Sequence, residues 1–202
     1  MDRGAWHRHA MTSQDDRSAS AAPPDEATLR EAALTYLARY AATEAALRRV
    51  LERKIDRWAR TVEDREAARE HIAVARQTAR AVVARLAAAG AVSDSAFAES
   101  RARSLIRAGR SRRAVAAQLV AKGVDAEMAR ASVPDDAEAE LGAALVLARR
   151  RRIGPFRTGE TADRQREIGI LARAGFPRAV AEQALDTEAE EAEAAIHRLR
   201  QG

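Results

Sequence analysis

The chain has 202 residues, with 35 Lys plus Arg against 30 Asp plus Glu, and only 3% of it is aromatic. Much of its 47% hydrophobic share is Ala, which buries little surface, so thin interfaces between stacked helices are expected rather than one large core. The absence of cysteine excludes disulfides, thiolate metal sites and cysteine nucleophiles. No stretch is apolar enough for a membrane span or a signal peptide, so we expect the chain in the cytoplasm.

Good helix formers dominate the sequence and predict an all-α protein. Residues 1–25 have almost no apolar periodicity and are predicted to form a disordered N-terminal tail. A first three-helix repeat is predicted over residues 26–89, with Thr43 as the N-cap of its second helix and Lys54 at a helix C-terminus. The charged residues 55–67 are interpreted as a linker inside this repeat.

Two further repeats are predicted downstream. In the second, residues 90–132, Gly109 closes a helix that starts at Ser93, and Ser111 caps a helix that ends at Lys122. The third covers residues 133–202. The sequence thus predicts about nine helices in three sets of three.

Internal similarity supports this division, because a fixed period indicates one repeated supersecondary unit. Residues 113–119, Arg-Ala-Val-Ala-Ala-Gln-Leu, recur as Arg-Ala-Val-Ala-Glu-Gln-Ala at residues 178–184. A diverged copy lies upstream, where Thr43 and Lys54 align with Ser111 and Lys122 at an offset of 68 residues. We interpret the three strings as the middle helix of each unit.

Catalytic chemistry has little support in the sequence. His71 and His197 have no nucleophile or carboxylate placed for a triad, and no glycine-rich phosphate loop occurs. We therefore expect no enzyme activity, no catalytic residue, no metal site and no cofactor.

A basic segment is the best candidate for a binding surface. Residues 101–124 carry seven cationic side chains and no acidic one. At 100° per residue Arg103, Arg107 and Arg110 share one helix face, and the lack of carboxylates suggests an anionic partner, either phosphate or acidic protein. The four arginines at 149–152 point in all directions around a helix. They are equally well explained as cations at a helix C-terminus, where positive charge is favourable. The candidate partner-binding residues are Arg101, Arg103, Arg107, Arg110, Arg112, Arg113 and Lys122.

Several of these strings resemble the RecX family, bacterial regulators of the RecA recombinase. Residues 34–39 with 43–54 are similar to its first repeat, and residues 92–98 to its acidic turn followed by Phe-Ala. Residues 111–124 resemble its central helix, which ends in Lys-Gly and an aliphatic residue, and residues 174–176 resemble its third repeat. The similarity covers about residues 30–185.

The resemblance implies an elongated curved array of three tandem three-helix repeats. Such a protein would lie in the helical groove of the RecA–DNA filament and span neighbouring protomers, and would thereby inhibit filament assembly, ATPase, strand exchange and co-protease activity. The implied partners are the RecA filament and single- or double-stranded DNA. We expect the chain to bind them as a monomer. One alternative is a DNA-binding regulator that uses residues 111–122 as a recognition helix. Another is a helical adaptor without a role in recombination.

Overall fold

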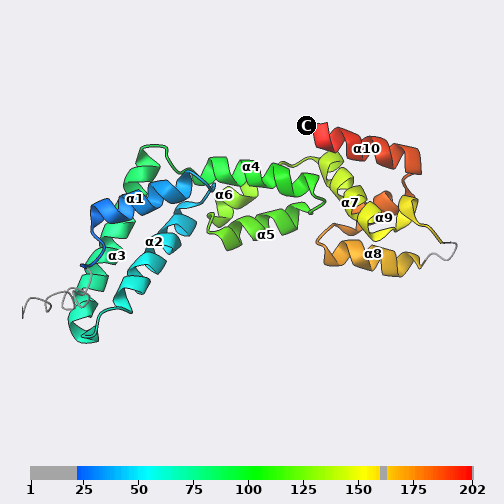
Figure 1. The fold of residues 1–202 in the computed structure, drawn as a ribbon. Coiled ribbons are helices and arrows are strands. Elements are labelled where there is room, and N and C mark those ends of the chain that lie inside the picture. Colours follow the sequence, from blue (N-terminus) through cyan, green and yellow to red (C-terminus); the bar gives the residue numbers. More distant parts are fainter. Residues whose placement is uncertain (1–21, 160–162, 202) are drawn as a thin grey trace, which may run out of the picture.

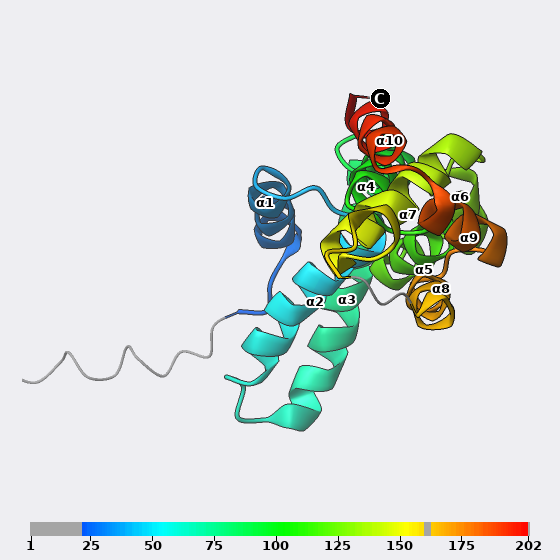
Figure 2. The same ribbon diagram turned by 90° about the vertical axis from the view of Figure 1, so that its right-hand side faces the viewer.

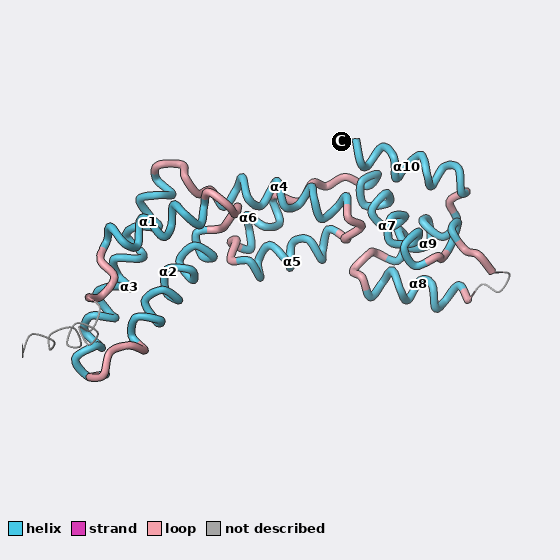
Figure 3. Tube along the Cα trace, in the orientation of Figure 1, coloured by secondary structure: helices cyan, strands magenta, loops and turns pink. Residues whose placement is uncertain are grey.

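The computed structural model describes residues 22–159 and 163–201, and within these ranges it contains helices and no strand (Figure 3). The all-α prediction is therefore confirmed. The helices form an elongated, bent row of three groups (Figure 1). Residues 1–21 of the predicted tail lie outside the described ranges. The last residue of the predicted tail, Asp25, caps the first helix by accepting a hydrogen bond from the Thr28 N–H.

The N-terminal group contains three helices with a core of its own. Leu47, Leu51 and Ile55 are fully buried on one face of its second helix and pack with the long third helix. The far ends of the second and third helices project away from the other groups (Figure 2). Its helices are α1 (Glu26–Leu37), α2 (Glu44–Ala59) and α3 (Arg65–Ala88).

The linker expected at residues 55–67 is much shorter than predicted. Helix α2 continues to Ala59 because Ile55 completes its buried stripe, and α3 already begins at Arg65. Lys54 therefore lies within α2, so its predicted place at a helix C-terminus is wrong.

The central group consists of three shorter helices with side-chain caps. Ser93, Ser111 and Asp125 each accept a hydrogen bond from a backbone N–H of the turn they start. The turn after the first of these helices holds Gly109 at φ +81°, and a Cβ there would lie 2.8 Å from Cγ1 of Val146. Only glycine fits so close to the next group. The helices are α4 (Asp94–Arg107), α5 (Arg112–Lys122) and α6 (Ala126–Ala131).

The C-terminal group has one α-helix more than the three that were predicted. The additional helix packs against the first helix of the group, and a Cβ on Gly142 would lie 3.2 Å from Cβ of Leu199. The described elements are α7 (Ala137–Arg151), the 3₁₀ turn η1 (Gly154–Phe156), α8 (Arg164–Arg173), α9 (Arg178–Asp186) and α10 (Ala189–Gln201).

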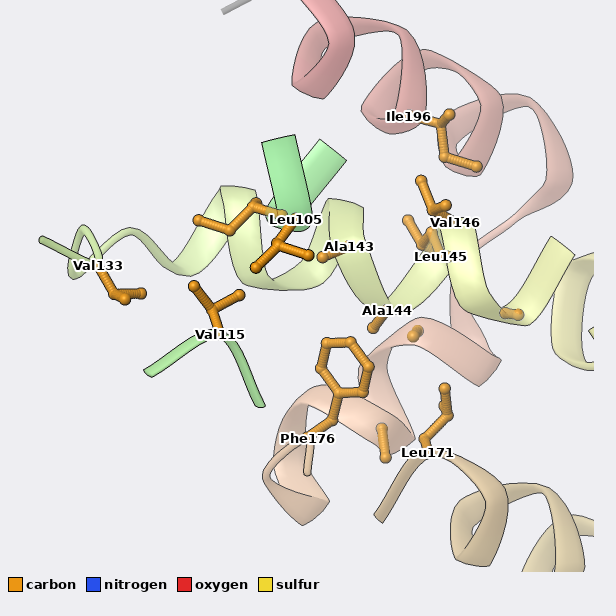
Figure 4. Packing of buried hydrophobic residues seen from close by; sticks show 14 of the residues in the cluster. Leu105, Val115, Val133, Ala143, Ala144, Leu145, Val146, Leu171, Phe176 and Ile196 are labelled. Atoms are coloured by element: carbon orange, nitrogen blue, oxygen red, sulfur yellow. The ribbon is translucent and has the colours of Figure 1, made fainter. Parts of the chain in front are cut away.

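The central and C-terminal groups share one hydrophobic core, whereas the N-terminal group is separate. Leu105 and Val115 of the central group belong to the same buried cluster as Leu145, Phe176 and Ile196 (Figure 4). The N-terminal cluster reaches only as far as Val92. The contact between the first two groups must therefore depend on other interactions.

A polar joint connects the N-terminal group to the central one. The Thr43 hydroxyl caps α2 by accepting from the Ala46 N–H at 3.0 Å and donates to the Lys122 carbonyl at 2.8 Å. The next amide, Glu44 N–H, donates to Oδ1 of Asp94 at 2.8 Å. The acceptor carbonyl ends α5 just before Gly123, which has φ +98°. We call this set of bonds the first joint.

The second joint, between the central and C-terminal groups, repeats the same pattern. The Ser111 hydroxyl accepts from the Ala114 N–H at 3.2 Å and donates to the Ala174 carbonyl at 2.8 Å. The following amide, Arg112 N–H, donates to Oε2 of Glu140 at 3.0 Å. Gly175, at φ +95°, follows the acceptor carbonyl.

The joints correct the alignment of the third repeat. Gly123 and Gly175 take the same place in the two joints, and they are 52 residues apart. The same offset carries Ser111 to Asp163, the N-cap of α8, so α8 matches α5. The prediction that residues 178–184 form the middle helix is therefore wrong, because they lie in α9, which matches α6. The near-identical string reflects two helices with similar apolar spacing.

Candidate partner-binding surface

The basic segment does not form one continuous face. Helix α4 ends at Arg107, and the left-handed Gly109 turns the chain before Arg110. Arg103 and Arg107 are exposed on α4, and Arg110 is exposed in the turn beyond it. The helical projection that placed all three on one stripe therefore holds only for the first two.

Arg112 already has anionic partners inside the chain. Its guanidinium forms an ion pair with Asp135, and its backbone N–H donates to the buried Glu140. Its Nε is buried without a hydrogen-bond partner among the described residues. Arg112 thus contributes to the second joint, whereas its neighbour Arg113 is exposed beside a depression that Pro177 and Val180 help to line.

Burial changes the acidity of the carboxyl group that receives this amide. Burial raises the pKa of Glu140, while the hydrogen bond from the Arg112 N–H and the charge of Arg112 act in the opposite direction. The pKa is raised because desolvation is the largest of these effects. In the second joint, loss of solvation therefore makes the ionised form of Glu140 less favourable than it is in water.

Arg101 and Lys122 lie next to the first joint, whereas Arg110 lies beside the second joint. Both line a cleft of about 700 Å³ between α1 and α4. Lys122 ends α5, as predicted for a cation at a helix C-terminus. Its backbone carbonyl accepts hydrogen bonds from Thr43 and from Nη2 of Arg49.

The structure brings Arg110 together with three arginines from the C-terminal group. These side chains line a groove of about 500 Å³ whose remaining residues are small or aliphatic, and no carboxylate takes part in the lining. None of the four has an ion pair with any described residue, and one of them donates to the carbonyl of Ala108 at 3.3 Å. We call this feature the arginine groove; its four cations are Arg110, Arg150, Arg151 and Arg173.

Helix ends account for part of this clustering. Arg150 and Arg151 lie in the last turn of α7, Arg173 ends α8, and Arg110 follows the end of α4. Each helix C-terminus carries about half a negative charge, so three of them offset about 1.5 of the four positive charges. A net charge of about +2.5 remains for an external anion, because no Asp or Glu is among the described residues that line the groove.

Three of these four arginines were not among the candidate binding residues predicted from the sequence. The run at 149–152 was interpreted as pointing in all directions, and the structure shows that it does divide: Arg149 pairs with Glu193, and Arg152 takes the left-handed cap position at φ 54°. The other two turn into the groove. Arginines at the ends of successive helices could have indicated this groove from the sequence. Only the packing of α8 against α7 shows that these helix ends lie close together.

The described residues offer little for catalysis. The ring of His71 lies edge-on to Trp58, with centroids 6.5 Å apart, and His197 lies 3.2 Å from the amide nitrogen of Gln201. Across residues 22–159 and 163–201, no three His, Asp or Glu side chains are grouped in a way that could hold a metal ion. None of the helices in this part of the chain is long and apolar enough to cross a membrane.

Comparison with known proteins identifies related sequences. The family model described as RecX, second three-helix domain, matches residues 93–132. A relative named "Regulatory protein RecX" from Myxococcus xanthus (strain DK1622) is 40% identical over 164 residues, which cover 79% of this chain and 84% of that protein. A relative with the same name from Agrobacterium fabrum (strain C58) is 36% identical over 105 residues, 51% of this chain and 56% of that protein. No solved structure matches the chain significantly.

Proposed function

This chain belongs to the RecX family of regulatory proteins, and from that premise we propose that it binds the RecA recombinase filament and inhibits its activities. The proposed role is that of a non-enzymatic regulator that acts in the cytoplasm on a DNA-bound filament. It would limit filament assembly, ATP hydrolysis, strand exchange and co-protease activity, in keeping with the regulatory name of its relatives.

The repeated joint is the observation that best supports this proposal. Thr43 and Ser111 use the same bonds to hold consecutive helix groups, so the array presents its groups in a regular order. A filament offers equivalent surfaces on successive protomers. Several modest contacts can then add through effective concentration, without any deep substrate pocket.

The arginine groove is the proposed main contact, together with Arg103 and Arg107. Four guanidiniums without a carboxylate attract an anionic surface and can form bidentate bonds with carboxylates or phosphates. The acidic surface of a protein and the phosphates of filament DNA both satisfy this chemistry. Arg112 is left out of the proposed contact because Asp135 already neutralises it.

The alternative of a sequence-reading DNA regulator has less support. The helix proposed for recognition, α5, has its N-terminal end in the second joint, where Arg112 is committed to Asp135 and Glu140. Beyond Arg113, Ala117 and Val120 are exposed but have no group for bonding to base edges, and Gln118 is only partly exposed. Lys122 is exposed at the far end of the helix, next to the first joint. A duplex-binding affinity with clear sequence preference would favour this alternative over the filament.

The decisive test is RecA ATPase activity on single-stranded DNA, measured with the purified protein at a substoichiometric ratio. We expect the full chain to inhibit and the double variant Arg110→Glu, Arg173→Glu to need at least about tenfold more protein for the same inhibition, which corresponds to about 1.4 kcal/mol. The matched control is Arg53→Glu, Arg80→Glu, which makes the same change of charge at exposed positions of α2 and α3. Failure of the unaltered chain to inhibit would refute the proposed function.

A further inference from the structure

The cleft of about 700 Å³ beside the first joint is separate from the arginine groove. One wall is the C-terminal end of α1 with the residues that follow it, including Tyr36 and Tyr40. The other wall is a continuous face of α4, because Phe97, Arg101 and Ser104 recur at intervals of four and three residues. Residues 90–93 close the cleft between the two walls.

Aromatic side chains are concentrated here although they are rare in the chain. Both tyrosines and one of the three phenylalanines line the cleft. The rings of Tyr36 and Tyr40 lie 5.1 Å apart at 39°, and Tyr40 remains 57% exposed. An exposed aromatic ring on a packed support is typical of the anchoring core of a protein interface.

The charges in the cleft have one sign. Arg101 and Lys122 line it, no Asp or Glu does, and neither cation pairs with a described carboxylate. Tyrosine, phenylalanine and arginine are enriched in interface cores, where aspartate and glutamate are depleted. The lining therefore favours an occupant that supplies an apolar side chain and negative charge.

We infer that this cleft docks a short peptide segment of a partner protein, in which a large apolar side chain stands close to one or more carboxylates. The apolar side chain lies against Tyr40 and Phe97, and a carboxylate meets Arg101 or Lys122. This inference goes beyond the proposed function and does not depend on it, because it concerns a different surface and a free peptide can test it.

A nucleic-acid strand fits the cleft less well than a peptide does. A strand brings a phosphate at each nucleotide and is bound along an extended basic track with rings that stack on successive bases. The cleft offers two cations, and its two tyrosine rings contact each other. Two cations match one or two carboxylates, whereas the arginine groove has the higher charge density that phosphates require.

The first joint holds the cleft in shape before any partner arrives. Thr43 and Lys122, which are joined by the 2.8 Å hydrogen bond, both belong to the lining. Because the two walls come from different helix groups, this bond limits how far they can separate. A preformed cleft loses less conformational entropy on binding than one that must be assembled.

The test starts from a phage-displayed library of random dodecapeptides selected on the immobilised full chain. The enriched peptides are then labelled with fluorescein and titrated by anisotropy against four proteins: the unaltered chain, Tyr40→Ser, Arg101→Glu and the control Arg80→Glu. Arg80 is exposed on α3, does not line the cleft and has no place in the proposed filament contact. Unfolding midpoints of all four proteins are compared, so that loss of binding is not confused with loss of fold.

Enriched peptides should combine an aromatic or large aliphatic residue with Asp or Glu. Their affinity should fall at least about tenfold in Tyr40→Ser and in Arg101→Glu, and should change less than about twofold in Arg80→Glu. Enrichment no greater than on a blank surface, or peptides that bind all four proteins equally, would overturn the inference. Binding of an oligo(dT) strand that is lost in both cleft variants, with no peptide behaving likewise, would assign the cleft to nucleic acid instead.

Discussion

The hydroxyl of Thr43 donates a 2.8 Å hydrogen bond to the carbonyl of Lys122, 79 residues further along the chain. Thr43 is fully buried, and its oxygen also caps α2 through the Ala46 N–H. One side chain therefore starts a helix and fixes that helix to the end of another. Ser111 and Ala174 have the same relationship at the second joint. The stability of the array should depend strongly on these two hydroxyl groups.

We expect Thr43→Val to destabilise the protein by about 2–4 kcal/mol. The change keeps the shape of the side chain but removes the cap, which contributes about 1 kcal/mol, and leaves the Lys122 carbonyl without its main donor, which costs about 1–3 kcal/mol. Urea unfolding followed by circular dichroism measures the difference. Arg49 still donates to the same carbonyl at 3.1 Å, so the loss should lie below the upper limit.

Thr43→Ser and Thr78→Val serve as controls for this prediction. Serine keeps the hydroxyl and should restore most of the stability. The Thr78 hydroxyl bonds only to the Val74 carbonyl within its own helix, so its removal should change the free energy of unfolding by less than about 1 kcal/mol. Equal effects of the two valine substitutions would show that the joint has no special role.

The glycine that follows the acceptor carbonyl provides a second prediction. Gly123→Ala should destabilise the protein by about 2–5 kcal/mol. The left-handed backbone at φ +98° alone costs an alanine about 1–2 kcal/mol, and its Cβ would clash with Cβ of Ala45, so overpacking adds about 1–3 kcal/mol. Thermal or urea unfolding gives the measurement.

Replacing Gly90 separates the cost of the left-handed backbone from the cost of overpacking. It has φ +72°, but a Cβ there would meet no atom within 4 Å, so Gly90→Ala should show only the backbone cost of about 1–2 kcal/mol. If Gly123→Ala and Gly90→Ala are equally stable, contact with Ala45 adds no overpacking cost at position 123.

Local features of the helices could be predicted from the sequence, because capping and apolar spacing are properties of neighbouring residues. Thr43, Ser93 and Ser111 were recognised as N-caps, and all three cap helices in the structure. The second role of Thr43 and Ser111 could not be predicted. A hydroxyl that caps a helix looks the same in sequence whether or not it also reaches a carbonyl in another group.

The arrangement of the groups limited the prediction of the binding surface. Arg110 was predicted to join Arg103 on one helix face, whereas the left-handed Gly109 redirects the chain and places Arg110 beside Arg150. Charge counting found the basic segment but could not tell that Asp135 neutralises Arg112. The third repeat was aligned wrongly because residues 178–184 closely resemble residues 113–119. The spacing of 52 residues between Gly123 and Gly175 gives the correct alignment, but only the structure shows that these two glycines are equivalent.

The raised pKa of Glu140 predicts a dependence of stability on pH. The pKa of Glu140 in the folded protein lies above its unfolded value of about 4.3. Its contribution to the free energy of unfolding is therefore fully present below about pH 4.3 and is lost as the pH rises through the folded pKa. Glu140→Gln keeps an acceptor for the Arg112 N–H and does not ionise. The stability of the variant relative to the unaltered chain should therefore increase from acidic pH to neutral pH and then level off.

Urea unfolding of both proteins at a series of pH values tests this dependence. Glu138→Gln is the control, because Glu138 is exposed at the start of the same helix. Replacing it should lower the free energy of unfolding by no more than about 0.3–1 kcal/mol, because the variant loses the favourable interaction of a carboxylate with a helix N-terminus. A difference for Glu140→Gln that does not vary with pH would contradict the role assigned to burial.

At each end of the array, the described residues lack the groups that form such a joint, so we predict a monomer. The offset of 52 residues matches Ser111 to Asp163, and a carboxylate cannot donate a hydrogen bond to the carbonyl of another group. At the other end, the offset of 68 residues matches Gly123 to Ile55, which is fully buried within α2 and leaves no left-handed turn to receive a hydroxyl. A second copy therefore cannot dock through this joint at either end. Sedimentation velocity should give a single species near 21.9 kDa whose coefficient does not change with concentration, and a reversible dimer would show that the array extends by a different contact.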